Sequence, residues 1–218
     1  MIYLDANATE SLRPEARAAA ITALDCLGNP SSVHGEGRAA RRMLEDARST
    51  IAARFGPGEV IFTSGGTEAN ALAIHGLGAG RRVLVGATEH PAVLAAARDA
   101  ILLPVDGTGR IALDALESLL REGPALVCLM SANNETGVLH PIAEAAALCR
   151  AAGARLHVDG VQAAGRGPVP MGWDSLALSG HKFGGAKGAG ALVLAPGVPI
   201  GPLIAGGGQE RGRRGGTE

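Results

Sequence analysis

The sequence predicts an α/β protein with a mostly parallel sheet and helices on both of its faces. Short apolar segments of strand length alternate with alanine-rich segments of helix length, a pattern typical of βαβ units. Hydrophobic residues make up 46% of the 218 residues, which is ample for a buried core. Only 2% are aromatic, which indicates close packing of helices on the sheet. The length fits one large α/β domain or one and a half ordinary ones.

Each element can be placed in order along the chain. Met1–Thr9 predicts an entry strand or an extended arm, and Pro14–Leu27 a helix with proline in its first turn. A loop rich in turn-forming residues precedes a helix over about Arg38–Phe55. Short apolar runs predict strands at Val60–Thr63, Arg82–Val85, Ile101–Val105, Ala125–Met130, Leu156–Val158, Asp174–Leu178 and Ala191–Leu194. Helices are predicted between them at Thr67–Ile74, Pro91–Ala100, Leu113–Arg121 and Ile142–Ala152.

Charge and composition exclude several classes of protein. A formal net charge of -1 argues against binding to nucleic acid or to an anionic membrane surface. The N-terminus lacks the features of a secretory signal and no apolar run is long enough to span a bilayer, so we expect a cytoplasmic protein. Cys26, Cys128 and Cys149 are widely spaced, with no histidine at metal-ligand spacing, so we expect no metal site.

Two lysines stand out in a chain that otherwise uses arginine. Lys182 and Lys187 are the only lysines among 20 Lys+Arg. An amine can lose its proton and form a Schiff base with a carbonyl group, which a guanidinium cannot do. Lys182 is the better candidate because it follows a predicted buried strand and has Ser179 and His181 beside it. Lys187 lies among glycines in a predicted surface turn.

Polar segments follow five of the predicted strands. Ligands of parallel sheets bind beyond the carboxyl ends of the strands. The segments are Ser64–Glu68, Glu89–Pro91, Asn133–Gly137, Asp159–Gln162 and Ser179–Lys182. Each alone is more often a cap or a turn, but five together, one with an amine, predict a ligand site.

Pyridoxal 5'-phosphate has a group for each of these partners. Lys182 would bind its aldehyde. The helix start at Gly66 and Thr67 would hold its phosphate, because free N–H groups and the positive end of the helix dipole face an anion there. Asp159 would pair with the protonated pyridine nitrogen and keep the ring an electron sink. His90 could lie flat over the ring. We therefore predict this cofactor.

The chain resembles the cysteine desulfurases, in the class V aminotransferase branch of the fold-type I pyridoxal-phosphate enzymes. The matching motifs are LDANAT (4–9), GNPSSVHGEGR (28–38), FTSGGTEAN (62–70), TEHPAVL (88–94), NNETG (133–137), HVDGVQAAG (157–165), SGHKFGGAKGAG (179–190) and GGGQERGRRGGTE (206–218). They span the entire chain in the family's order, so the resemblance is highly specific.

The resemblance implies a role for each residue around the cofactor ring. Lys182 would be the catalytic lysine that binds the aldehyde, and Asp159 the partner of the pyridine nitrogen. His90 would stack on the ring. Gln162 would hydrogen-bond the ring hydroxyl oxygen, and Asn134 would lie near that hydroxyl and the substrate.

For the phosphate, the resemblance implies Gly66 with Thr67, and Ser179 with His181. Thr217 of the partner subunit would complete this site, which implies a homodimer. The reaction implied removes sulfur from L-cysteine, leaves L-alanine and carries the sulfur away as a persulfide on a protein thiolate. A sulfur acceptor or an iron–sulfur scaffold protein would be a further partner.

Parts of the family pattern are missing. The family's sulfur-accepting cysteine and its arginine for the substrate carboxylate lie beyond the GGTE segment. Gln209 stands where histidine is usual, Gly215 where serine is usual and Glu10 where threonine is common. We therefore expect a truncated chain. Its predicted parts are an N-terminal arm (1–13), a cofactor-binding large domain (14–205) and a glycine-rich tail (206–218) that leads toward an absent C-terminal small domain.

Three other interpretations compete with the desulfurase. A selenocysteine lyase or an aminotransferase of the same fold would share Lys182, Asp159 and His90, but Asn133–Glu135 and Gly206–Gly208 favour the desulfurase. A non-catalytic remnant that binds the cofactor gains weight from the missing cysteine. A nucleotide-phosphate loop at GGAKGAG fails because no hydroxyl residue follows its lysine.

Overall fold

The computed structural model describes residues 2–217, whose strands form a seven-stranded sheet in the order β1-β7-β6-β5-β4-β2-β3. The strands are β1 (Glu59–Thr63), β2 (Arg82–Gly86), β3 (Ile101–Leu103), β4 (Ala125–Met130), β5 (Arg155–Asp159), β6 (Ser175–Ser179) and β7 (Gly190–Leu194). Strand β7 runs antiparallel to its neighbours β1 and β6, whereas the other neighbouring strands are parallel. The predicted mostly parallel sheet is therefore confirmed.

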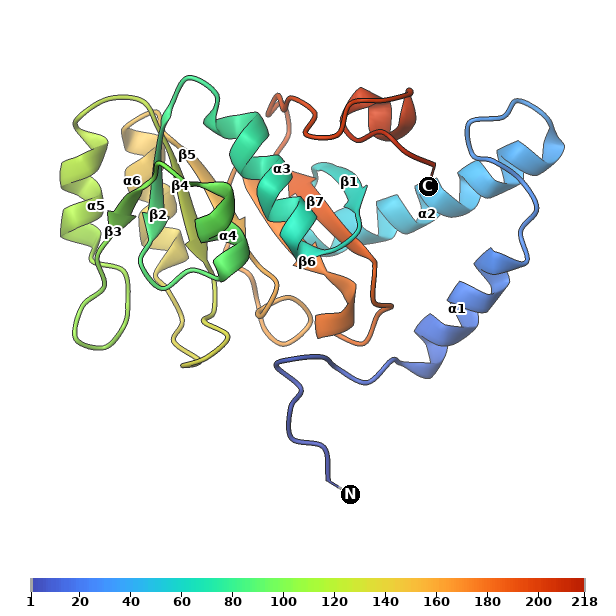
Figure 1. Cartoon of the computed structure of the whole chain (residues 1–218), viewed down its shortest axis with the longest axis horizontal. Helices are drawn as coiled ribbons and strands as arrows, with labels where there is room; N and C mark the ends of the chain where they lie inside the picture. Colours follow the sequence, from blue (N-terminus) through green and yellow to red (C-terminus); the bar gives the residue numbers. More distant parts are fainter. Residues whose placement is uncertain (1, 218) are drawn as a thin grey trace.

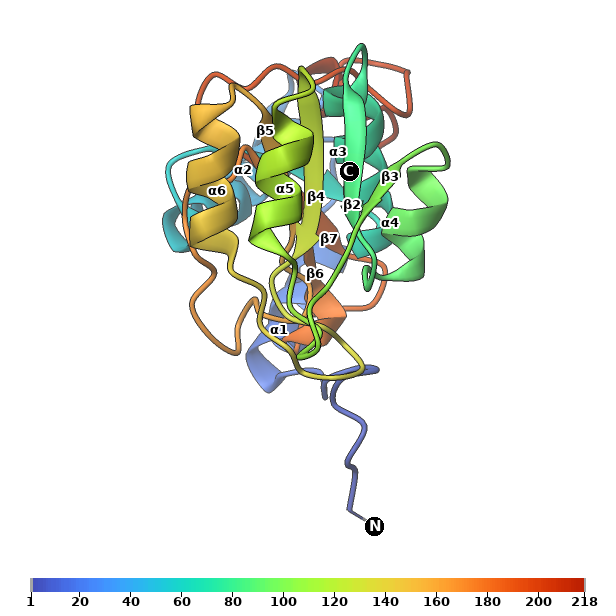
Figure 2. The ribbon, with the colours of Figure 1, turned by 90° about the vertical axis from the view of Figure 1, so that its left-hand side faces the viewer.

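Helices cover both faces of this sheet, as predicted. They are α1 (Pro14–Leu24), α2 (Gly35–Phe55), α3 (Gly66–Gly78), α4 (Pro91–Ala96), α5 (Leu113–Leu120) and α6 (Ile142–Ala151). Figure 2 shows α5 and α6 on one face and α3 and α4 on the other. Two clusters of buried side chains fill the layers, one containing Leu116 and Ile142 and the other Leu72 and Val93.

Helix α4 and strand β3 end earlier than the sequence predicts because the backbone turns there. Helix α4 ends at Ala96 rather than Ala100, since Ala97 leaves helical geometry with φ -109° and ψ 57°. Strand β3 then ends at Leu103, before Pro104, whose nitrogen has no hydrogen to continue the ladder.

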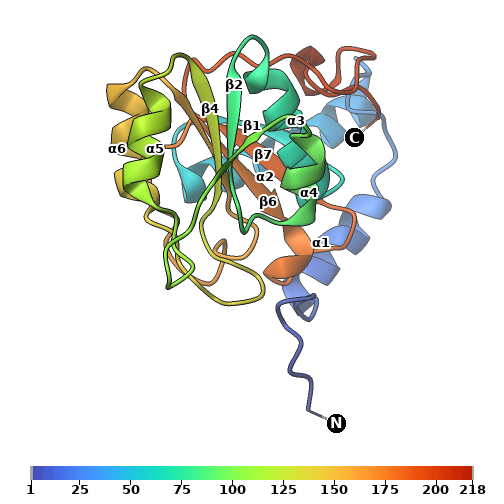
Figure 3. The ribbon, with the colours of Figure 1, turned by 60° about the vertical axis from the view of Figure 1, so that its left-hand side comes forward.

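Helix α1 stands away from the sheet, whereas α2 packs Ile51, Ala52 and Phe55 against the core. Helix α1 ends at Leu24 rather than Leu27, and α2 begins at Gly35 rather than Arg38, with the ring of His34 accepting a hydrogen bond from an N–H of its first turn. Helix α1 contains no buried residue, and Figures 1 and 3 show it standing apart from the layered body. Within residues 2–217, no helix combines the length and apolar character that crossing a membrane requires.

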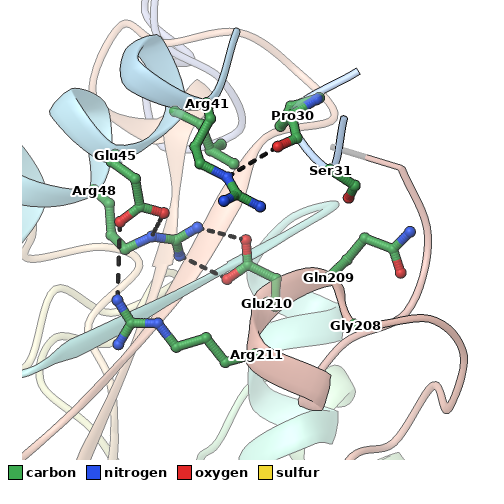
Figure 4. A pocket seen from close by; sticks show the side chains of 10 residues that line it. Pro30, Ser31, Arg41, Glu45, Arg48, Gly208, Gln209, Glu210 and Arg211 are labelled. Atoms are coloured by element: carbon green, nitrogen blue, oxygen red, sulfur yellow. Dashed lines mark hydrogen bonds and ion pairs between the residues drawn. The ribbon is translucent and has the colours of Figure 1, made fainter. Parts of the chain in front are cut away.

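A buried ion pair fixes the glycine-rich tail to the body. Glu210 binds the Arg48 guanidinium of α2 through both carboxylate oxygens, at 2.7 and 2.9 Å. Glu210 also accepts the N–H of Phe62 at 3.0 Å, and Arg48 donates to the carbonyl of Val60 at 2.6 Å. Figure 4 shows the pair in the wall of a cavity of about 310 Å³ between α2 and the tail. No residue predicted to bind the cofactor lines this cavity, so we assign the pair to positioning the tail.

Candidate active site

The carboxyl ends of the parallel strands bring the predicted residues to one edge of the sheet. The register pairs Met130 of β4 with Asp159 of β5, and Asp159 with Ala177 of β6. Ser179, the last residue of β6, pairs with Gly190 of β7. These strands end together, so the polar residues after them share one region. The N-terminal arm lies below this edge in Figure 1.

Lys182 lies in a 3-10 turn directly after β6. Its amine donates a hydrogen bond to the backbone carbonyl of Asn7 at 2.6 Å. Partial burial lowers the pKa of Lys182, and the Arg166 guanidinium lowers it further, while Asp159 and Asp5 act in the opposite direction. A lowered pKa increases the fraction of neutral amine, which is the form that attacks a carbonyl carbon.

Asp159 ends β5 and is buried, with 6% of its surface exposed. Burial raises the pKa of this carboxyl group. Hydrogen bonds from the Val161 N–H at 3.0 Å and the Asn70 amide at 2.7 Å lower it, as do the charges of His90 and Lys182. A buried carboxylate held in this way can pair with a cationic N–H group, such as a protonated ring nitrogen.

A chain of buried hydrogen bonds supports Asp159 from behind. Atom Nε2 of His157 lies 2.8 Å from Asn70 Oδ1, and Nδ1 lies 2.8 Å from Ser175 Oγ. Burial lowers the pKa of His157 to about 3, so the ring is neutral. Because the Asn70 amide nitrogen donates to Asp159, its oxygen accepts from Nε2–H of His157, and Nδ1 accepts from the Ser175 hydroxyl. The sequence prediction misses Asn70, whose only signal is a polar residue on the apolar face of α3.

A cleft of about 450 Å³ opens beside the start of α3. Gly66, Thr67, Ser179 and His181, the residues predicted to bind phosphate, all line it. Helix α3 has no side-chain cap at this end, so its first N–H groups are available to an anion. A Cβ at Gly66 would lie 2.7 Å from a methyl carbon of Val161. Glycine is therefore required for this close approach of helix and sheet, and the cleft suits a phosphate group.

The other predicted residues take different positions. His90 is exposed at the start of α4, where Nδ1 accepts a backbone N–H at 3.1 Å. Gln162 donates at 3.1 Å to the Asn7 carbonyl that also accepts from the lysine amine. The side chain of Asn134 donates to the neighbouring glutamate at 2.8 Å. Thr217 is exposed and does not line the cleft; its predicted contact is with a partner subunit.

Arg166 ties the N-terminal arm to the site, a role that the sequence does not predict. Its guanidinium donates to the Ala6 carbonyl at 2.7 Å and to Asn7 Oδ1 at 3.0 Å. It also donates to Gln162 Oε1 at 2.5 Å. The same cation lowers the pKa of Lys182, so one side chain both orders the arm and favours the neutral amine.

Comparison with known proteins agrees with this geometry. The family described as Aminotransferase class-V matches residues 2–212. The chain is 45% identical over 236 aligned residues to a cysteine desulfurase of Cereibacter sphaeroides, and 41% identical over 235 to the cysteine desulfurase IscS of Dictyoglomus turgidum. These alignments include 100% of this chain but 61% and 60% of the two relatives. The chain therefore spans about three fifths of their length.

Solved structures share the fold over the whole chain. A NifS-like protein from Rickettsia africae superimposes with a TM-score of 0.94 at 37% identity, covering 100% of this chain and 64% of that one. The structure described as SspA in complex with cysteine gives 0.90 at 30% identity, covering 100% and 69%. The predicted fold-type I architecture is thereby confirmed. From its sequence match and its fold, the chain belongs to the class-V aminotransferase family.

Proposed function

We propose that this chain binds pyridoxal 5'-phosphate and carries out the cofactor chemistry of a cysteine desulfurase. One observation carries the proposal: an amine with a lowered pKa, a buried carboxylate and an anion cleft meet at one edge of the sheet. The names of the relatives, cysteine desulfurase and IscS, support the choice of reaction.

The residues present fit the cofactor. The buried Asp159 would pair with its ring nitrogen, and the cleft at the start of α3 would hold its phosphate. When bound, the cofactor supplies an aldehyde for amines and a ring that delocalises electrons. Lys182 would hold that aldehyde, and its amine would move a proton at the substrate α-carbon. Gln162 and His90 orient the ring, and the Asn7 carbonyl holds the lysine amine in the absence of an aldehyde.

The sulfur must leave on a thiol. In a balanced reaction, L-cysteine and a thiol give L-alanine and a persulfide. Burial raises the pKa of Cys149 to about 12 and that of Cys128 well above its ordinary value, so neither forms the attacking thiolate. Cys26 lines a cavity with Pro30 and Phe62, away from the candidate active site. We therefore expect another segment or a partner protein to supply the acceptor.

The proposal includes an assembly. A homodimer would let Thr217 of the partner subunit reach the phosphate cleft. An iron–sulfur scaffold or another sulfur acceptor in the cytoplasm would take the persulfide sulfur, which agrees with the IscS name of one relative. We also propose that 1–13 forms the arm, 14–205 the cofactor-binding large domain and 206–218 a connection toward a small domain.

Alanine production tests the proposed reaction. The purified chain is incubated with pyridoxal 5'-phosphate, L-cysteine and dithiothreitol as acceptor, and L-alanine is measured by mass spectrometry. We expect alanine from the wild-type chain and none from Lys182→Ala. Alanine from L-selenocysteine alone would identify a selenocysteine lyase. Bound cofactor without alanine from either substrate would contradict the enzyme and favour a non-catalytic cofactor-binding protein.

A further inference from the structure

The phosphate cleft contains one lysine to which the proposed function gives no role. The residues that line the cleft are Ala8, Thr9, Ser64, Gly65, Gly66, Thr67, Ser179, His181, Lys187 and Gly188. Lys187 is the only lysine or arginine in this set. Partial burial lowers the pKa of His181, so its ring is mostly neutral there. A phosphate monoester brings a charge of about -1.5 to -2 into the cleft at neutral pH.

We propose that Lys187 supplies the positive charge that neutralises the cofactor phosphate in this cleft. This inference rests on the proposed binding of pyridoxal 5'-phosphate and adds a residue to that site. It gives the second lysine a role distinct from that of Lys182, because one lysine acts as a nucleophile and the other as a fixed charge.

Two side chains of the cleft, Ser179 and Lys187, are free to bind an anion, whereas His181 Nδ1 lies 3.1 Å from Thr9 Oγ1. Ser179 is 4% exposed, and neither its hydroxyl group nor the Lys187 amine has a hydrogen bond or ion pair within residues 2–217. A hydroxyl group that lines a cleft without a protein partner is available to hydrogen-bond an anion there. Lys187 also lines a neighbouring cavity with Glu10, yet these two residues form no ion pair.

The backbone holds Lys187 at the rim of the cleft. Its turn follows a hydrogen bond from the Gly185 N–H to the Gly180 carbonyl at 2.8 Å. Gly188 then adopts a φ of +78°, which glycine reaches without strain. Burial lowers the pKa of His181, and the charges of Lys182 and Lys187 lower it further, so Lys187 lies near enough to act on a charge in the cleft. Because Lys187 is exposed, salt screens this field.

Binding of two forms of the cofactor separates a charge effect from a structural one. Dissociation constants of pyridoxal 5'-phosphate and of pyridoxal, which lacks the phosphate, are measured by absorbance titration of the cofactor-free chain. The variants are Lys187→Met, Lys187→Arg and, as a control for lost charge elsewhere, Arg42→Met on the exposed side of α2.

We expect Lys187→Met to raise the dissociation constant of pyridoxal 5'-phosphate about five- to tenfold at low salt. Its affinity for pyridoxal should stay unchanged, and Lys187→Arg should bind as the wild type does. The difference should shrink toward zero as salt is raised to about 0.5 M. Equal weakening of both ligands, or no weakening of either, would overturn the inference. A wild-type chain that binds neither ligand would instead contradict the proposed function itself.

Discussion

Replacing Asn70 with leucine tests how the site holds its carboxylate. The Asn70 side chain is 1% exposed and joins Asp159, at 2.7 Å, to His157, at 2.8 Å. Leucine has a similar shape but leaves a buried carboxylate without a donor and a buried ring N–H without an acceptor. Losing a hydrogen bond to a charged group costs about 1.5–3 kcal/mol, and an unpaired neutral group about 1–3 kcal/mol. We therefore expect Asn70→Leu to lower the free energy of unfolding by about 3–5 kcal/mol.

The loss should depend on pH. Burial raises the pKa of Asp159 above its value in the unfolded chain, and the Asn70 hydrogen bond opposes this rise. Removing Asn70 raises the pKa further. A carboxyl group whose pKa is raised in the folded state lowers the free energy of unfolding as the pH rises above 3.8, the pKa of the group in the unfolded chain. The variant should therefore be destabilised more at pH 8 than at pH 4.

Urea unfolding of the cofactor-free chain, followed by circular dichroism, measures both effects. The matched control is Asn134→Leu. Within residues 2–217 the side-chain amide of Asn134 hydrogen-bonds only an exposed glutamate, so its loss should change stability by less than about 0.5 kcal/mol. A loss below about 1 kcal/mol for Asn70→Leu would refute the assigned hydrogen bonds. An equal loss of unfolding free energy at pH 4 and pH 8 would refute the claim that Asn70 stabilises the charged form of Asp159.

Two further predictions concern buried charges outside the cleft. Arg48→Met removes the cation that the buried Glu210 carboxylate binds through both oxygens and should destabilise the chain by about 3–5 kcal/mol in urea unfolding. The double variant Arg48→Met with Glu210→Leu should recover most of this loss, and a double variant no more stable than the single one would contradict it. Glu89 is buried, and burial raises its pKa well above the ordinary 4.5. Above pH 4.5 the free energy of unfolding of the wild type should therefore fall by up to about 1.4 kcal/mol per pH unit relative to that of Glu89→Gln. Parallel stability–pH curves for the two chains would contradict this.

The sequence is sufficient to place the main groups of the site because strand direction controls them. Asp159 and Ser179 end neighbouring strands β5 and β6, and Lys182 follows β6 within one turn. The carboxyl ends of such strands lie on one edge, so an apolar run followed by a polar residue is enough to predict their proximity. The glycine pair before Thr67 likewise predicts a helix start with free N–H groups.

What supports these groups depends on contacts between distant parts of the chain. The hydrogen bond from Lys182 to Asn7 and the clamp of Arg166 on the arm join segments more than 150 residues apart. Neither periodicity nor spacing contains such information. Asn70 and His157 are buried polar residues whose partners become known only when α3 packs on the sheet. The roles of Gln162 and Asn134 remain predictions that a bound cofactor must test.

The attachment point of the cofactor tests the central claim most directly. The purified chain is mixed with pyridoxal 5'-phosphate, reduced with borohydride and digested, and the modified peptide is located by mass spectrometry. The account predicts one pyridoxyl-phosphate group on Lys182, with no modification of Lys187 and no adduct in Lys182→Ala. An adduct on Lys187, or no adduct with cofactor in excess, would contradict it.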